Sequence, residues 1–298
     1  MSKIYLYGMI CLSHSFLIGD EFLIPDTYRE MQQKYCFPGG ETGTCATVLS
    51  SLGANVLMDG NHICGDAVKT VKEFYTQRSV DISPLKFDEN GEALEDYIII
   101  SGDIRTPLGT FGKFYENAKS SSEKPWSTPK EEHIRGCNAA AVDPYFFEDS
   151  EKAARLCVKC GVPYVTVDCA YDSYIHKNSA VSVISGENFE NTCKGRTRQE
   201  ITESYMQNGG GLTIITNGGG EFVYGRKGCD IKRFTPYNVK VQSTLGAGDS
   251  FKAGCVYALA QGMDDQGLVS FASAVAAAAI SRFPIPSIRR KRTKFTAL

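Results

Sequence analysis

The chain has 298 residues, and its 32 lysines and arginines nearly balance its 34 aspartates and glutamates. This balance excludes a general attraction to nucleic acid, and the length suffices for a large α/β domain with a sizeable core. No apolar run approaches the roughly 20 residues of a membrane helix, and the chain does not open on a signal segment. We therefore expect a cytoplasmic protein with no nucleic-acid and no membrane partner.

Short apolar segments of strand character alternate with helical segments, which is typical of a mostly parallel sheet with helices on both faces. The predicted strands cover residues 4–12, 55–59, 80–82, 139–143, 164–168, 181–185 and 212–216. The predicted helices cover residues 42–52, 67–78, 150–160, 197–208, 251–261 and 267–282. We expect one domain over residues 1–298.

Two segments, residues 16–37 and 92–114, interrupt this alternation with mixed polar and β-type residues. We expect them to form a small β-lid over a site, and their strand edges could pair two copies of the chain as a homodimer. Residues 120–126 are polar and contain Pro125, which predicts an exposed loop. Five cations in residues 289–294 favour a solvated tail over a targeting or nucleic-acid patch.

The most informative stretch is Gly246-Ala247-Gly248-Asp249, which directly precedes a predicted helix. Small residues allow a tight turn and a close approach to a ligand. Amides at a helix N-terminus bind anions, and Asp249 is placed to accept a proton from an attacking hydroxyl. The alternative interpretation is a helix start with small packing residues, but the carboxylate and the preceding Thr244 favour phosphoryl transfer.

Other stretches carry weaker signals. Gly39 and Gly40 precede a helix, with Thr44 one turn later, and on their own they indicate a turn capped by Thr42. The run from Thr216 through Gly218 to Gly220 follows an apolar strand, where amides could meet phosphate or a hairpin could turn.

Taken in order along residues 4–286, these stretches resemble the signatures of the ribokinase-like (PfkB) carbohydrate kinases. The resemblance implies an ATP-dependent phosphotransferase acting on a hydroxyl of a sugar or sugar-like small molecule. It makes Asp249 the general base and the amides of Gly246, Ala247 and Gly248 the anion hole. It also assigns binding of the acceptor to one set of residues and binding of the nucleotide to another. The acceptor group is Ser13, Gly39, Gly40, Thr44 and Arg105, and the nucleotide group is Thr216, Gly218, Gly220 and Thr244.

The resemblance also implies Mg²⁺ near Glu187 and Glu190, where a pair of acids at a helix start is the alternative. For Arg105, an exposed charge on an edge strand is an equally good interpretation. Ser243 stands where the family has an Asp that helps to hold a monovalent cation, so the need for that cation stays open.

Departures from the family pattern concentrate on the acceptor side. Ser13 and Thr44 replace the Asp and Asn that contact sugar hydroxyls in the family. We therefore expect an active kinase with an unusual acceptor. Two alternatives remain, a kinase of the same fold for a nucleoside or vitamin-like alcohol and a non-catalytic protein that binds a metabolite. The intact Asp249 argues against the second, because a binding protein needs no base.

Overall fold

The computed structural model describes residues 1–19, 24–102, 104–192 and 195–285. Its larger sheet has eight strands in the order β14-β13-β12-β11-β10-β9-β1-β4. The six strands from β12 to β4 run parallel, and β13 and β14 are added antiparallel at one edge. The strands are β1 (Lys3–Gly8), β4 (Asn55–Gly60), β9 (Ala139–Val142), β10 (Tyr164–Val167), β11 (Val181–Ile184), β12 (Leu212–Ile215), β13 (Phe222–Gly225) and β14 (Lys232–Phe234).

Alternation along β1 shows how the sheet is covered on both faces. Ile4 and Leu6 point to one core and Tyr5 and Tyr7 to the other, and all four are fully buried. Helices on the first face are α1 (Gly40–Ser51), α2 (Ala67–Thr76), α9 (Ala247–Ala260) and α10 (Asp265–Ile280). Elements on the second face are α3 (Phe111–Ser120), α4 (Glu131–Ile134), η1 (Pro144–Phe146), α5 (Glu148–Lys159) and α6 (Tyr174–Asn178). The predicted fold class is confirmed.

Two further helices, α7 (Gly186–Thr192) and α8 (Arg198–Asn208), form a smaller core with β11 and β12. Thr197 begins α8 with a reciprocal capping box, in which its side chain and that of Glu200 exchange hydrogen bonds with backbone amides. Among the helices of the described ranges, none is long and apolar enough to cross a membrane.

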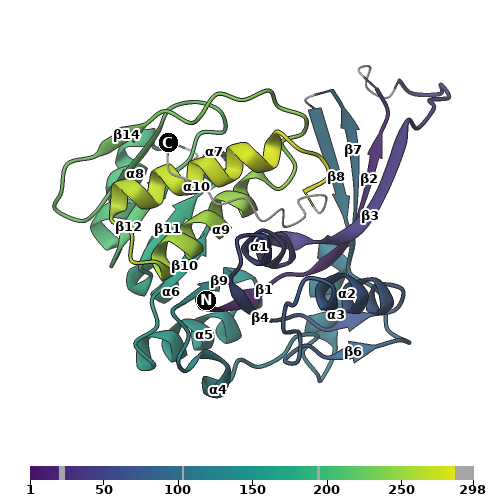
Figure 1. Cartoon of the computed structure of the whole chain (residues 1–298), viewed down its shortest axis with the longest axis horizontal. Coiled ribbons are helices and arrows are strands. Elements are labelled where there is room, and N and C mark those ends of the chain that lie inside the picture. Colours follow the sequence, from purple (N-terminus) through teal and green to yellow (C-terminus); the bar gives the residue numbers. More distant parts are fainter. Residues whose placement is uncertain (20–23, 103, 193–194, 286–298) are drawn as a thin grey trace.

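A separate four-stranded sheet stands beside the body in the order β3-β2-β7-β8 (Figure 1). Its strands are β2 (Cys11–Leu17), β3 (Gln33–Gly39), β7 (Glu95–Ser101) and β8 (Ile104–Gly109). We call this sheet the lid. A two-stranded pair, β5 (Ile63–Cys64) with β6 (Phe87–Asp88), lies between the lid segments in sequence.

The predicted strand over residues 4–12 is wrong in one respect, because the structure divides it into β1 and β2. Asn61 explains the break. Its side chain accepts a hydrogen bond from the Ile10 amide at 2.8 Å and donates one to the Ile10 carbonyl at 2.9 Å. Both backbone groups of Ile10 are thereby satisfied outside any ladder, so the chain leaves the body and enters the lid.

One other local prediction is wrong, and the prediction of an exposed loop over residues 120–126 is correct only in part. Residues 80–82 form no strand and contribute a single bridge from Asp81 to Leu57 at the sheet edge. Residues 120–126 are exposed only up to Lys124, because Trp126 is buried. The Trp126 indole stacks on Phe146 with ring centroids 5.1 Å apart and donates a hydrogen bond to Asp149 at 2.9 Å.

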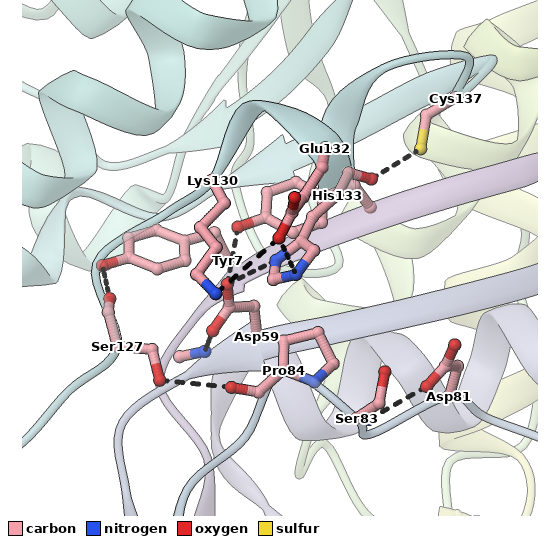
Figure 2. A network of polar contacts seen from close by, with 12 residues as sticks. Tyr7, Asp59, Asp81, Ser83, Pro84, Ser127, Lys130, Glu132, His133 and Cys137 are labelled. Carbon is pink, nitrogen blue, oxygen red and sulfur yellow. Dashed lines mark hydrogen bonds and ion pairs between the residues drawn. The ribbon is translucent and has the colours of Figure 1, made fainter.

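A buried carboxylate ties the sheet to α4 (Figure 2). Asp59, near the end of β4, accepts a hydrogen bond from the Tyr5 hydroxyl at 3.0 Å, and its Oδ2 lies 3.5 Å from Nδ1 of His133. Nearby, the Tyr7 hydroxyl donates to the carbonyl of Ser127 at 2.7 Å. The Asp59 carboxylate and the Tyr5 and Tyr7 hydroxyls have hydrogen-bond partners within the protein, so we assign them to the fold.

Candidate active site

The order of strands in the larger sheet locates the site. Strand β1 lies between β9 and β4, so the connections that leave β1 and β9 diverge to opposite sides. In open α/β sheets, ligands bind outside the carboxyl ends of the strands at such a switch point. Gly8 ends β1 and Asp143 directly follows β9, so both residues stand at this point.

A buried ion pair fills the base of the switch point. Lys252 of α9 donates to both oxygens of Asp143, at 2.8 and 3.0 Å, and neither residue is exposed to solvent. Thr42 of α1 donates to Asp143 Oδ2 at 2.7 Å. A Cβ at Gly8 would lie 2.3 Å from that oxygen, so only glycine fits there. The Lys252–Asp143 ion pair, together with Thr42 and Gly8 packed against it, thus connects β1, β9, α1 and α9 beneath the site.

Above this pair lies a cavity of about 200 Å³ between the lid and the body. It is lined by residues from β2, β3, β7, the start of α1, the start of α9 and the segment after α10. The lining residues are Ser13, Phe37, Pro38, Gly39, Gly40, Glu41, Thr44, Thr47, Asp96, Ile98, Phe111, Leu245, Gly246, Asp249, Phe283 and Ile285. The predicted residues Ser13, Gly39, Gly40, Thr44, Gly246 and Asp249 therefore surround one space.

The glycine pair at the start of α1 is required by close packing. A Cβ at Gly39 would lie 2.0 Å from the Ser13 hydroxyl, and one at Gly40 would lie 2.7 Å from the Met9 carbonyl. Gly40 also has φ of +78°, which favours glycine. Gly39 is the N-cap of α1 and makes no side-chain cap, so the alternative interpretation of a turn capped by Thr42 does not hold. Thr42 instead binds Asp143.

The start of α9 offers backbone donors beside Asp249. Gly246 is the N-cap with φ of +72°, and its own carbonyl accepts from the Ser250 amide at 2.9 Å. The Ala247 amide donates to the Thr244 carbonyl at 3.2 Å. Within the described ranges, the amides of Gly246 and Gly248 have no backbone acceptor. A Cβ at Gly248 would meet no atom within 4 Å, whereas one at Gly246 would lie 2.6 Å from Ile285 Cδ1 and 3.2 Å from Thr44 Cγ2.

The charged groups around Asp249 shift its pKa in opposite directions. Burial raises the pKa of Asp249 to about 6, while the Lys252 ammonium acts to lower it. Asp143 raises this pKa further, Arg105 lowers it and Asp96 raises it. A carboxyl group with a pKa near 6 is mostly ionised at neutral pH and is a stronger base than an ordinary aspartate.

Glu41 is the second acid at the cavity with an altered pKa. Burial raises its pKa to about 7, Asp249 and Asp143 raise it further, and Lys252 lowers it. Glu41 and Asp249 therefore interact, and their titrations belong to the pair.

The residues Thr216, Gly218 and Gly220, predicted to bind the nucleotide, lie at and after the end of β12, close to the ends of β10 and β11. Asp168, after β10, accepts from the amide of Ser185 at 2.7 Å and from its hydroxyl at 3.0 Å. Gly186 begins α7, and a Cβ there would lie 3.2 Å from the carbonyl of Thr216. The predicted glycines at 218 and 220 lie in the turn between β12 and β13, and a Cβ at Gly218 would face open space. This hairpin therefore adjoins the start of α7.

Arg105, Glu187 and Glu190 were also predicted to belong to the site. Arg105 does not line the cavity, but its Nη1 donates to the Thr244 carbonyl at 2.5 Å, so it joins the lid to the loop before α9. Glu187 is exposed in the first turn of α7. The backbone of Glu190 belongs to α7, but its side chain lies outside the described residues, as does the tail over residues 289–294.

Ser243 lies where a carboxylate for a monovalent cation was expected from the family pattern. The residue is buried, and its hydroxyl accepts a hydrogen bond from the Leu245 amide at 3.2 Å. The side chain therefore supports the turn that leads into Gly246.

The sequence did not reveal four charged residues of the site. Asp96 stands in a strand and Asp143 directly after one, while Glu41 and Lys252 adjoin the glycine stretches at 39–40 and 246–249 but were assigned no role. One available signal was Asp143, an acid that directly follows a short apolar strand. For Lys252, the small-residue pattern of α9 predicts a buried helix, so a lysine there is a buried charge that needs a partner.

Comparison with known proteins identifies the class. Residues 11–284 match the pfkB family of carbohydrate kinases, so the chain belongs to that family. It is an ATP-using phosphotransferase with an alcohol group as acceptor, as members of this family are. The predicted class of enzyme is confirmed.

Individual relatives are distant. A 5-dehydro-2-deoxygluconokinase from Clostridium perfringens is 24% identical over 263 residues, which is 80% of this chain and 77% of the relative. Ribokinase from Arabidopsis thaliana, solved with ribose and ATP, has a TM-score of 0.74 at 14% identity, covering 96% of this chain and 95% of its own. Ribokinase from Thermotoga maritima has a TM-score of 0.74 at 16% identity, with 97% and 96% covered. These two structures support the fold.

Proposed function

We propose that this kinase transfers the γ-phosphate of ATP to a hydroxyl of a sugar-like molecule held in the cavity between lid and body. One observation carries the proposal. The Asp249 carboxylate lines that cavity at the start of α9, where the Gly246 and Gly248 amides are without backbone acceptors in the described structure. A base and anion donors at one helix start are the two parts that phosphoryl transfer needs.

In this mechanism, Asp249 accepts the proton of the acceptor hydroxyl as its oxygen forms the bond to phosphorus. The Gly246 and Gly248 amides stabilise the charge on the transferred group. ATP supplies the phosphoryl group. Ser13 and Thr44 offer hydroxyls that donate to and accept from the acceptor. Phe37, Ile98 and Phe111 bring apolar surface from the lid side of the cavity and from α3, which helps to exclude water.

The nucleotide is proposed to lie along the ends of β11 and β12. The turn containing Gly218 leaves room for a close approach, and Thr216 lies beside the start of α7. Mg²⁺ fits this arrangement in the way typical of kinases, with one or two carboxylates, the phosphates and water as ligands. Glu187 is exposed beside this turn and is the described carboxylate that we assign to that role, with Glu190 as its proposed companion.

The clostridial relatives are named for a sugar-acid acceptor, 5-dehydro-2-deoxygluconate. Such an acceptor would bring a carboxylate into a cavity that already contains those of Glu41, Asp96 and Asp249. Like charges at short distance in a partly buried site repel strongly. We therefore favour an acceptor without a negative charge.

The test is ADP release with ATP, Mg²⁺ and a panel of sugars and polyols, measured for the wild type and Asp249→Asn. Loss of a general base lowers kcat by about 10²–10⁴-fold, so we expect that fall with at least one acceptor. Asp230→Asn changes an exposed aspartate in the turn between β13 and β14 and serves as the matched control. An Asp249→Asn enzyme with wild-type turnover would refute the role of this residue.

A further inference from the structure

The cavity carries an excess of negative charge. Glu41, Asp96 and Asp249 line it, and none of the described lining residues is Lys, Arg or His. They stand on three different elements: the start of α1, strand β7 of the lid and the start of α9. An acceptor in this cavity is therefore approached by a carboxylate from several sides.

The cations nearby are already engaged. Lys252 is bound to both oxygens of Asp143 beneath the cavity and does not line it. Arg105 donates to the Thr244 carbonyl at the rim. These two cations act on a group of four carboxylates, the three of the cavity and Asp143. Because the pKa of Glu41 is raised to about 7, this carboxyl group is only partly ionised at neutral pH, and the group as a whole still keeps a net negative charge in the described part of the protein.

Asp96 has an unsatisfied hydrogen-bond acceptor. Its Oδ1 is buried and has no hydrogen-bond partner within the described residues, while its Oδ2 accepts a weak bond from the Cys11 thiol at 3.4 Å. Burial raises the pKa of Asp96, hydrogen bonding from Ser13 and Cys11 lowers it, and His14, which is bound to Glu95 at 3.0 Å, lowers it electrostatically. A buried acceptor without a donor costs free energy unless a ligand supplies the donor.

A metal ion does not account for the excess charge. The described residues include no group of three acidic, histidine or cysteine side chains that could hold one ion. The three carboxylates do not form such a group, and they line a space of about 200 Å³. The aromatic rings of Phe37, Phe111 and Phe283 line the same space, and such rings attract organic cations as well as apolar groups.

We propose that the acceptor is an amine-bearing sugar or polyol, whose ammonium group is held by Asp96 and Glu41 while one of its hydroxyls faces Asp249. This proposal rests on the kinase function proposed above. In the reaction, the hydroxyl oxygen forms a bond to the γ-phosphorus of ATP, the bond from that phosphorus to the β,γ-bridging oxygen breaks, and the hydroxyl proton passes to Asp249. The ammonium group positions the acceptor and stays protonated throughout.

The test compares pairs of acceptors in which an ammonium group replaces one hydroxyl. Glucosamine with glucose, and 1-amino-1-deoxyfructose with fructose, are two matched pairs, and gluconate is the anionic probe. We expect kcat/KM to be at least about tenfold higher for the amine of at least one pair, as charge-assisted hydrogen bonds are the strong ones. Gluconate should be the poorest acceptor. Equal values within both pairs, or a preference for gluconate, would overturn the proposal while leaving the kinase function intact.

Variants assign the preference to named residues. Asp96→Asn and Glu41→Gln keep an amide oxygen as acceptor but remove the charge, so the ratio of amine to neutral kcat/KM should fall toward one. Glu92→Gln is the matched control, since Glu92 is an exposed acid that pairs with Lys113 and does not line the cavity. Its ratio should match that of the wild type. An unchanged ratio in both Asp96→Asn and Glu41→Gln would contradict the assignment.

A binding measurement separates this proposal from the proposed function. If none of the acceptors releases ADP, the kinase function with such sugars fails. Calorimetric titration of each matched pair into the wild-type protein with ATP analogue and Mg²⁺ then still measures the charge preference. Tighter binding of the amines would support the proposal, and equal binding of amine and neutral sugar would refute it.

Discussion

At the scale of single residues, Lys252 shows how a buried charge can serve a site that it does not touch. Its ammonium is fully buried, one turn along α9 from Asp249, and its hydrogen bonds go to Asp143. It lowers the pKa of Asp249 and of Glu41, both of which burial raises. Without it, Asp249, the proposed base, would hold its proton to a higher pH.

This arrangement predicts the pH dependence of the reaction. The base must be ionised, and the pKa values of Asp249 and Glu41 are about 6 and about 7. We therefore expect kcat/KM to rise with pH across about pH 6 to 7 and then to level off. In Lys252→Met the rise should move to higher pH, because the charge that stabilises both carboxylates is absent. Rate profiles between pH 5 and pH 9 measure the shift.

Stability must be measured on the same variant. Removing one partner of a buried pair costs about 3–5 kcal/mol because the other charge stays buried without compensation. Lys252→Arg keeps the charge and controls for the change in packing, and Lys69→Met changes an exposed lysine of α2. A folded Lys252→Met enzyme whose pH profile matches that of the wild type would show that Lys252 does not tune the base.

At the scale of elements, α9 carries the site and α10 fixes the position of α9. A Cβ at Gly254 of α9 would lie 2.6 Å from Cα of Ala272 in α10 and 3.2 Å from its Cβ. Glycine thus lets the two helix backbones approach closely. Gly112 of α3 is the opposite case, since a Cβ there would meet no atom within 4 Å.

The same substitution should therefore have opposite effects in the two helices. Gly254→Ala should destabilise the protein by about 1–3 kcal/mol, because the new methyl group forces the helices apart. Gly112→Ala should stabilise it by up to about 1 kcal/mol, because alanine favours the helix. Urea unfolding of both variants measures the two changes. Equal effects of the same sign would mean that helix propensity, and not the α9–α10 contact, decides at Gly254.

The sequence predicted most of the body and less of the lid. Strands 139–143 and 212–216 were found because buried parallel strands are continuous apolar runs. The division of residues 4–12 depends on Asn61, which is distant in sequence, so no local pattern marks it. The burial of Trp126 depends in the same way on Phe146 and Asp149.

The residues of the site, too, could be predicted from the sequence only where they form a local motif. Glycines and the acid in 246–249 form a local motif, so they could be predicted. Glu41 and Asp96 acquire a role only because α1 and β7 meet around one cavity. Residue type alone does not separate them from exposed acids such as Glu92.

At the scale of the whole molecule, the cavity is formed by the lid and the body together. Ser13 and Asp96 come from the lid, and Gly246 and Asp249 from the body. Arg105 is on β8 of the lid and donates to the carbonyl of Thr244, which also accepts from the Ala247 amide. This bond links the lid to the loop that presents the proposed anion donors.

Removing the bond should loosen the lid without removing any lining residue. In Arg105→Ala we expect KM for the acceptor to rise by about tenfold, in keeping with one lost charge-assisted hydrogen bond. We also expect more ADP per phosphorylated product, because a less closed site admits water. Lys34→Ala, which removes an exposed cation from β3 of the lid, should change neither quantity. If Arg105→Ala raised KM but kept one ADP per product, the bond would serve acceptor binding alone and not the exclusion of water.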